Sequence, residues 1–270
     1  MNQQHGSGRV AAFFDLDGTL VARPSLERRF FAELRYRHTI PTRNYFLWLA
    51  RAVWLAPRGM QMILQANKMY LRGLPRDGRE SHNGGQPPRH GSGQAKMAVP
   101  RFFPEGLEQV AWHAQQGHAI VLVSGTLEPL AQEMALALVV RLAVRGITAS
   151  VAVCATRLEQ RGGRWTGQIL GDAMFGEAKA RAVAQLARCK GFDLTECYAY
   201  GDSLSDRSML EAVGRPAAVN PSSRMARLAR RRGWSVFIWR EAKDLTQSSQ
   251  RPAQRARRGD EPLLGSGRVG

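Results

Sequence analysis

The sequence predicts an α/β fold, a doubly wound parallel sheet with a helical segment inserted after its first strand. Two observations support this prediction. Short apolar stretches, such as residues 10–14 and 120–123, alternate with stretches of helical periodicity, and strands that alternate with helices form parallel sheets. The long stretch between the first two strands shows helical periodicity alone. A chain of 270 residues is long enough for one large domain or two small ones.

The first strand and the turn after it are predicted to cover residues 10–21. Residues 22–77 are then predicted to be helical. Leu26, Phe30 and Leu34 recur at four-residue spacing, which is typical of the buried face of a helix.

Two more helical patterns follow in the inserted segment. Thr42 is the predicted N-cap of a helix over 45–55, and a third helix is predicted over 60–71. The predicted loop over 78–99 begins with a stretch, Gly78 to Gly93, that contains almost no apolar residue. Since such a stretch cannot bury a face, we expect a disordered loop there.

Residues 100–245 are predicted to complete the core that the first strand begins. Two helices are expected, over 107–116 and 177–187. Short apolar runs between turn residues predict the remaining strands. One strand starts near residue 119, and the others cover 149–155, 198–200, 217–220 and 235–239. A hairpin is predicted over 157–169. The polar ends of the chain, 1–9 and 246–270, are predicted to be disordered.

The net charge of +17 is concentrated toward the C-terminal end. Between residues 224 and 258 there are eleven Lys and Arg against two acids. Such a run is usually a solvated face or a disordered tail, and less often a contact with nucleic acid or an anionic membrane surface.

The cysteines and the hydropathy predict a cytoplasmic protein. Cys154, Cys189 and Cys197 form no C-x-x-C pair, so we expect reduced, mostly buried thiols. The polar N-terminus lacks the apolar core of a signal peptide, and no run reaches the roughly 18 apolar residues of a transmembrane segment. The oligomeric state stays open.

Two carboxylates, Asp15 and Asp17, stand directly after the first predicted strand and before Gly18. The carboxyl ends of strands are where open α/β sheets build their sites, and a carboxylate there can attack phosphorus. An ordinary turn explains the motif equally well. A calcium loop does not, because the next acid is Glu27.

Three further features follow in a fixed order along the chain. An apolar strand ends in Ser124-Gly125-Thr126, Lys179 lies near the start of a predicted helix, and another strand runs into Asp202 and Asp206. Together with Asp15-Leu16-Asp17-Gly18-Thr19, these features resemble the haloacid dehalogenase superfamily of phosphatases, in particular its phosphoserine-phosphatase-like subfamily IB. The motifs are specific jointly and weak one by one. The resemblance implies a Rossmann-like core and makes residues 22–77 a helical cap over the active site.

The resemblance also implies a role for each motif residue. Asp15 is expected to attack phosphorus and form an aspartyl-phosphate, while Asp17 protonates the leaving oxygen and later activates water. Mg²⁺, which favours carboxylate and carbonyl oxygens, is expected to be the cofactor. The residues expected to contact the metal or the phosphate are Asp15, Asp17 through its main-chain carbonyl, Asp202 and Asp206 for the metal, and Ser124, Gly125 and Lys179 for the phosphate.

Each of these side chains has a structural alternative. A lone residue like Ser124 is more often a turn hydroxyl, and one like Lys179 is nearly always a solvated surface charge. Asp202 and Asp206 are also typical of helix caps and turns. Their order and spacing as a set favour the functional interpretation.

The predicted function is therefore Mg²⁺-dependent hydrolysis of a small phosphorylated metabolite. Phosphoserine is a candidate from the resemblance, but the segment Ala22-Arg23-Pro24-Ser25 lacks the acid that phosphoserine phosphatases carry there. The alternative is a basic protein that binds nucleic acid or anionic lipid and has a degenerate phosphatase core. Steep salt dependence would mark that binding.

Overall fold

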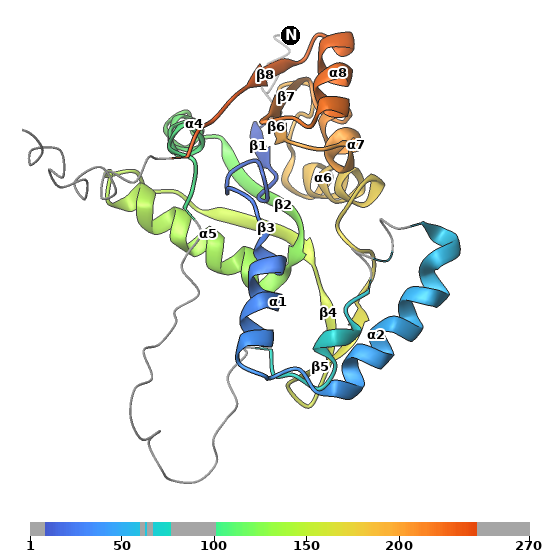
Figure 1. Cartoon of the computed structure of the whole chain (residues 1–270). Coiled ribbons are helices and arrows are strands. Elements are labelled where there is room, and N and C mark those ends of the chain that lie inside the picture. Colours follow the sequence, from blue (N-terminus) through green and yellow to red (C-terminus); the bar gives the residue numbers. More distant parts are fainter. Residues whose placement is uncertain (1–8, 60–62, 64–66, 77–100, 242–270) are drawn as a thin grey trace, which may run out of the picture.

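The computed structural model describes residues 9–59, 63, 67–76 and 101–241. Its centre is a six-stranded sheet in which every neighbouring pair is parallel, with the order β3-β2-β1-β6-β7-β8 (Figure 1). The chain moves outward from β1 to β3 and then returns to the middle for β6, which confirms the predicted doubly wound fold. The six strands are β1 (Ala11–Phe14), β2 (Ala119–Leu127), β3 (Val151–Thr156), β6 (Tyr198–Gly201), β7 (Arg215–Val219) and β8 (Ser235–Phe237).

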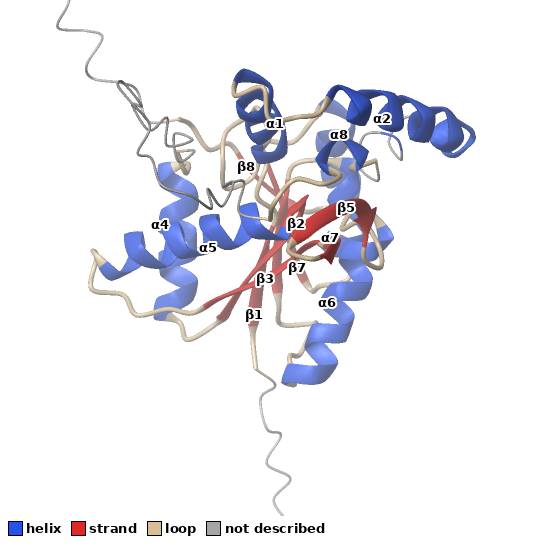
Figure 2. Ribbon diagram, turned by 90° about the horizontal axis from the view of Figure 1, so that it is seen from below, coloured by secondary structure: helices blue, strands red, loops and turns tan. Residues whose placement is uncertain are grey.

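Different helices cover the two faces of this sheet (Figure 2). Alternate residues of a strand point to opposite faces. Accordingly, Ala12 and Phe14 of β1 join the apolar cluster that contains α4 and α5, whereas Ala11 and Phe13 join the cluster that contains α6, α7 and α8. All four β1 residues are fully buried, so the strand that leads to Asp15 is held from both sides. The helices are α4 (Pro104–Gln115), α5 (Glu128–Ala143), α6 (Glu177–Lys190), α7 (Arg207–Glu211) and α8 (Ser223–Arg232).

A helical segment separates β1 from β2, as predicted. It contains α1 (Leu26–Tyr36), α2 (Thr42–Leu55) and two short 3-10 helices, η1 (Ala56–Arg58) and η2 (Met69–Leu71). In Figures 1 and 2 α1 and α2 stand outside the layers of the core.

A small hairpin of β4 (Leu158–Arg161) and β5 (Arg164–Ile169) ties the inserted segment to the core. The Gly73 amide donates to the Trp165 carbonyl at 2.7 Å, and the Trp165 amide donates to the Leu74 carbonyl at 2.9 Å. Phe30 of α1 also meets the Trp165 ring edge to face. The hairpin predicted over 157–169 therefore has a structural role as a support for the segment.

Some predicted details differ from the structure. Thr42 is the first residue of α2 rather than its N-cap, because Pro41 occupies the cap position. Of the third predicted helix, the described end is the 3-10 turn η2 and not an α-helix. The predictions for residues 60–62, 64–66, 78–99, 246–270 and most of 1–9 lie outside the described residues.

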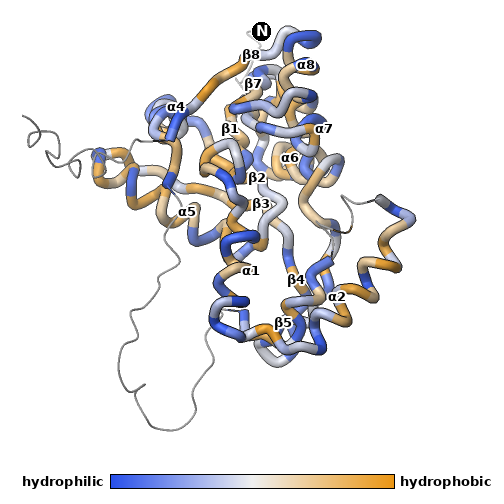
Figure 3. Tube along the Cα trace, in the orientation of Figure 1, coloured by the Kyte–Doolittle hydropathy of each residue, from blue (hydrophilic) through white to orange (hydrophobic). Residues whose placement is uncertain are grey.

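Helices α5 and α8 were not predicted from the sequence, for different reasons. On α5, Leu136 and Val140 are 66% and 54% exposed, so the helix lacks the polar face of an amphipathic helix; Figure 3 shows this hydrophobic character. Helix α8 lies inside the basic run and buries only Met225 and Ala229. The part of that run within α8 is thus a solvated helix face. No helix in the described residues is long and apolar enough to cross a membrane.

The three cysteines are all free thiols. Cys197 is buried and Cys154 is half-buried, but Cys189 is exposed. The prediction of mostly buried thiols is therefore wrong for Cys189, which lies between Arg188 and Lys190 in the last turn of α6.

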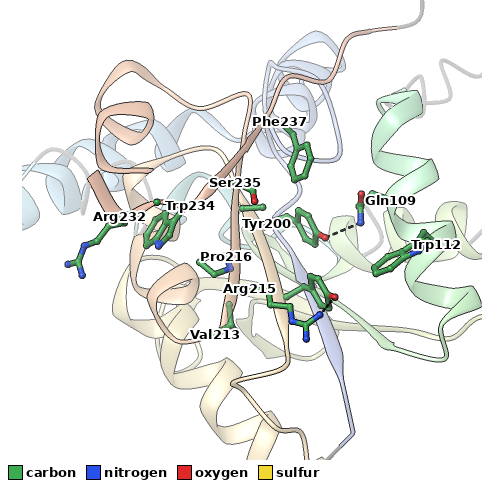
Figure 4. Close-up of a pocket in the computed structure, with 14 residues that line it drawn as sticks. Gln109, Trp112, Tyr200, Val213, Arg215, Pro216, Arg232, Trp234, Ser235 and Phe237 are labelled. Carbon is green, nitrogen blue, oxygen red and sulfur yellow. Dashed lines mark hydrogen bonds between the residues drawn. The ribbon is translucent and has the colours of Figure 1, made fainter. Parts of the chain in front are cut away.

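A buried polar cluster joins α4 to β6. His113 is fully buried, with Nε2 2.9 Å from the Tyr200 hydroxyl and Nδ1 2.8 Å from Nδ1 of His118. Gln109 donates to the same Tyr200 hydroxyl at 3.1 Å (Figure 4). Burial lowers the pKa of His113 to about 3, and the neighbouring His118 contributes to the shift. His113 is therefore neutral in the folded protein at physiological pH.

Acid is expected to destabilise the protein through His113. Its folded-state pKa of about 3 lies below the unfolded value of about 6.5. Its contribution to the free energy of unfolding is therefore complete above pH 6.5 and is lost as the pH falls toward 3, by at most about 1.4 kcal/mol per pH unit. Urea denaturation of wild type and His113→Gln should show wild type losing stability relative to the variant below pH 6. A difference that stays constant from pH 7 to pH 4 would contradict this account.

Candidate active site

Asp15 begins the loop at the carboxyl end of β1. Its amide donates to the Tyr200 carbonyl at 3.0 Å, which extends the pairing of β1 with β6 by one residue. Gly18 then turns the chain with φ of +93°, and a Cβ atom there would lie 2.2 Å from Asp202 Oδ2. Only glycine suits this position, because both the conformation and the space exclude a side chain.

The predicted site residues meet at one end of the sheet. Because β2, β1 and β6 are adjacent and parallel, their following loops open into the same space. A cavity of about 1080 Å³ lies there. Six of the seven predicted residues line it, namely Asp15, Asp17, Ser124, Gly125, Lys179 and Asp202. The seventh, Asp206, is 1% exposed and lies behind Lys179.

Lys179 is the charge centre of the site. Its Nζ donates to Asp15 Oδ1 and to Asp206 Oδ1, both at 2.6 Å. Burial alone would lower the pKa of Lys179, but the two carboxylates together raise it. The ammonium is therefore charged, and Lys179 is not the surface residue of the structural alternative.

Asp206 is the helix cap of the structural alternative and also pairs with Lys179. It belongs to a capping box in which the Ser203 amide and hydroxyl donate to its Oδ2 at 3.0 and 2.9 Å. Its other oxygen accepts from Lys179. One carboxylate thus caps a 3-10 turn and joins the charge cluster.

Three carboxylates come together in a way that suits a metal ion. Asp15, Asp202 and Asp206 offer oxygen atoms that all lie within 4.8 Å of one another, and all three residues are buried. Hard oxygen donors of this kind fit Mg²⁺. The Asp17 carboxylate is not part of this group, and a metal contact through the Asp17 main-chain carbonyl stays a prediction.

Burial raises the pKa of Asp15 well above its usual range, and Lys179 opposes that rise. Burial also raises the pKa of Asp202, where a hydrogen bond from Arg23 acts in the opposite direction. Concentrated negative charge in a dry site is unstable unless cations compensate it. Lys179 and Arg23 provide part of that compensation.

Asp17 is in a different environment. Its Oδ1 accepts from the Leu26 amide at 2.7 Å, at the first turn of α1. Burial raises the pKa of Asp17 to about 6, although that hydrogen bond works against the shift. A carboxyl with this pKa can both give and take a proton near neutral pH.

The C-terminal end of β2 brings Ser124, Gly125 and Thr126 to the same cavity as Asp15. Ser124 is buried, and its Oγ accepts from the Thr126 amide at 3.2 Å. This hydrogen bond is the one expected if Ser124 is an ordinary turn residue, but Ser124 also lines the cavity. Gly125 lies beside it, and its carbonyl accepts from Thr156 at 2.8 Å.

Sequence reasoning missed two contributors to the site. Arg23 forms an ion pair with Asp202 at 2.5 Å, and Ser203 fixes Asp206. Arg23 stands in the segment noted only for its missing acid, so the sequence contained no signal for it. Ser203 and Asp206 have the spacing of a capping box, which could have been recognised.

A second hollow lies on the sheet between α4 and α8 (Figure 4). It measures about 790 Å³, and its described lining includes Gln109, Trp112, Tyr200, Arg215 and Phe237. None of the lining residues is a carboxylate, a histidine or a cysteine. The reactive groups therefore gather at the first cavity.

Comparison with known proteins identifies the class. A family model described as haloacid dehalogenase-like hydrolase matches residues 12–211. This match covers most of the chain and includes every motif residue discussed above. The chain belongs to the haloacid dehalogenase-like hydrolases and, within them, to the phosphatases, which confirms the resemblance that the motifs indicated.

Two relatives and one solved structure illustrate this similarity. The chain is 31% identical over 235 residues to a probable phosphatase of Mycobacterium tuberculosis, covering 85% of this chain and 75% of that protein. It is 28% identical over 252 residues to a phosphoserine phosphatase of the same organism, covering 87% and 72%. A solved phospho-aspartyl intermediate analogue of phosphoserine phosphatase shares the fold with a TM-score of 0.52 at 17% identity, covering 90% of this chain and 99% of that chain.

Removal of the Lys179 charge is expected to destabilise the fold. Lys179→Met would leave Asp15 and Asp206 buried without their shared partner, which typically costs about 3–5 kcal/mol. Urea denaturation in the presence of a chelator measures this loss. Lys190→Met is the matched control, because Lys190 ends the same helix and is exposed. Adding Asp206→Asn to Lys179→Met should restore part of the stability. Equal effects of the Lys179 and Lys190 substitutions would show that the buried charge is unimportant.

Proposed function

We propose that this protein is a Mg²⁺-dependent phosphomonoester hydrolase that works through an aspartyl-phosphate on a small phosphorylated metabolite. One observation carries the proposal: Asp15 is buried at the base of an open cavity, next to a lysine ammonium and within reach of a second carboxyl with a raised pKa. A nucleophile, a cation and a proton donor are the three groups that phosphoryl transfer to a carboxylate requires.

In the first step an Asp15 carboxylate oxygen attacks phosphorus. The bond from phosphorus to the ester oxygen breaks, and that oxygen leaves with its electron pair. Asp17, protonated, gives its proton to the leaving oxygen, so an alcohol departs. Lys179 and Ser124 stabilise the charge on the phosphoryl oxygens.

In the second step Asp17, now ionised, takes a proton from water as the water oxygen attacks phosphorus. The bond from phosphorus to Asp15 breaks, which releases inorganic phosphate and restores the Asp15 carboxylate. Asp17 therefore alternates between acid and base. Its pKa of about 6 suits both roles, since the free energy needed to gain or lose the proton is small near neutral pH.

Asp15, Asp202 and Asp206 would hold the Mg²⁺ ion, together with the Asp17 main-chain carbonyl. The ion supplies positive charge that lets a phosphate dianion approach a carboxylate. Arg23 occupies one oxygen of Asp202 and lines the same cavity. The Arg23 side chain is 69% exposed, so it can leave that oxygen without disturbing the core.

The phosphoserine phosphatase among the relatives makes phosphoserine one candidate to test, although Ala22-Arg23-Pro24-Ser25 lacks an acid for its ammonium group. The three free thiols support a cytoplasmic location, where reduced cysteines are usual.

Asp15→Asn is expected to abolish turnover while leaving the fold intact, because the amide has nearly the same shape but is a far poorer nucleophile. Asp172→Asn is the matched control, since Asp172 is an exposed carboxylate that pairs with Arg181. The measurement is phosphate release from a phosphomonoester, with circular dichroism as the check on folding. Borohydride reduction during turnover, followed by mass spectrometry, should convert residue 15 to homoserine. Turnover by Asp15→Asn near the wild-type rate would refute the mechanism.

Activity is expected to disappear in excess chelator and to return when Mg²⁺ is added. The metal-free site concentrates three carboxylates, so a phosphate dianion would be repelled without the ion. Isothermal titration should also detect Mg²⁺ binding to wild type, and this binding should weaken in Asp202→Asn. Full activity in the chelator would rule out the proposed metal role of Asp15 and Asp202.

A further inference from the structure

The cavity extends well beyond the reactive groups. Its outer wall is formed by α1, α2 and residues 67–70, which contribute basic and aromatic side chains. In the proposed mechanism the phosphate lies against Asp15, so the leaving group must occupy this outer part. The described residues of the outer wall are Arg28, Phe31, Arg35, Tyr45, Trp48, Asn67, Lys68 and Tyr70, with Glu27 between them and the base.

The negative charge of Glu27 is already paired with groups of the protein itself. Its two oxygens accept from Lys68 Nζ at 2.5 and 2.6 Å, and Oε1 also accepts from the Tyr70 hydroxyl at 2.8 Å. The Lys68 side chain is only 1% exposed. The ammonium group of an amino-acid substrate would have to displace this lysine. Among the lining residues that the structure describes, the other carboxylates are Asp15, Asp17 and Asp202 at the base.

Helix α1 presents a basic stripe to the cavity. Arg28, Phe31 and Arg35 stand three and four residues apart, which places them on one face of the helix. Within the described ranges, neither Arg28 nor Arg35 forms an ion pair with a side chain. Phe31 is packed edge to face on Tyr70, with ring centroids 5.1 Å apart, so this part of the wall is firm. The stripe therefore offers positive charge without a protein counter-ion.

Helix α2 contributes aromatic side chains to the cavity. Tyr45 and Trp48, three residues apart, line it. Their neighbours Phe46 and Leu49 are 72% and 57% exposed and do not line it. Aromatic side chains on one face of a helix above a cavity suit stacking with a flat group.

We propose that the preferred substrate is a phosphomonoester whose leaving group is a flat ring that carries a second negative charge and no ammonium group. This inference rests on the proposed function and specifies its substrate class. Tyr45 and Trp48 stack with the ring, Arg28 and Arg35 pair with the second anion, and the closed Glu27–Lys68 pair excludes an amino acid. Phosphoserine, with its ammonium group and no ring, is then a poor substrate.

Five esters of primary alcohols separate these features. They are 4-carboxybenzyl phosphate (ring and anion), benzyl phosphate (ring only), 3-phosphoglycerate (anion only), glycerol 3-phosphate (neither) and phosphoserine (anion and ammonium). We expect kcat/KM to be highest for 4-carboxybenzyl phosphate, lower for benzyl phosphate and 3-phosphoglycerate, and lowest for glycerol 3-phosphate and phosphoserine. Phosphate release with Mg²⁺ present is the measurement.

Two variants test the two contacts separately. Tyr45→Ala should raise KM for both benzyl esters by roughly 3- to 10-fold and leave glycerol 3-phosphate unchanged. Arg35→Ala should raise KM for 4-carboxybenzyl phosphate by roughly 5- to 10-fold and leave benzyl phosphate unchanged, while Arg35→Lys should restore much of the loss. Both residues are exposed, so the substitutions are expected to fold. Phe46→Ala and Arg51→Ala, on the same helix as Tyr45 but outside the cavity lining, are the controls.

The outcomes show whether the inference about the substrate fails alone or together with the proposed function. If none of the five esters is hydrolysed, the proposed function fails and the inference fails with it. If esters are hydrolysed but phosphoserine is preferred, or the ring gives no advantage, only the inference fails. The same conclusion follows if the Tyr45 and Arg35 variants change KM for all esters equally, or no more than Phe46→Ala and Arg51→Ala do.

Discussion

The structure depends on one buried ammonium group that two carboxylates share. Lys179 Nζ lies 2.6 Å from both Asp15 and Asp206, and it connects α6 with the loops after β1 and β6. In a dry environment the acids would otherwise take up protons or destabilise the fold. The lysine opposes the effect of burial on the pKa of Asp15, and an ionised Asp15 is what nucleophilic attack requires. The contact that holds the site together is therefore also the one that keeps it reactive.

The register of the sheet explains why these groups meet. Phe14 of β1 is paired with Leu122 of β2 on one side and with Tyr200 of β6 on the other. Asp15 follows Phe14 by one residue, while Ser124 and Asp202 follow their paired residues by two. Three side chains from distant parts of the sequence thus emerge at the same end of the sheet, within one residue of the same level. A shift of one residue in any strand would turn its side chains to the opposite face.

The fold and the base of the site could be predicted because their signals are local. Short stretches of sequence are enough to recognise the apolar strands, their periodicity and the acids at their ends. The family match confirms the class of protein that they indicated. Helix α5 was missed because its apolar outer face hides the helical period. Arg23 and Lys68 were missed because their role is set by partners 179 and 41 residues away. A lone basic residue in the sequence does not indicate that a distant carboxylate is its partner.

Asp17 links the reactive base to the inserted segment. Its Oδ1 accepts from the Leu26 amide, and Leu26 is the first residue of α1, the helix that also carries Glu27 and Arg28. A change in the position of α1 would therefore alter both the outer wall of the cavity and the hydrogen bond that lowers the pKa of Asp17. Since that hydrogen bond opposes the effect of burial, its loss would favour the protonated acid. In the proposed mechanism, recognition of the leaving group and protonation of the leaving oxygen would thus be coupled through one backbone amide, and the inserted segment would take part in the chemistry as well as in selection.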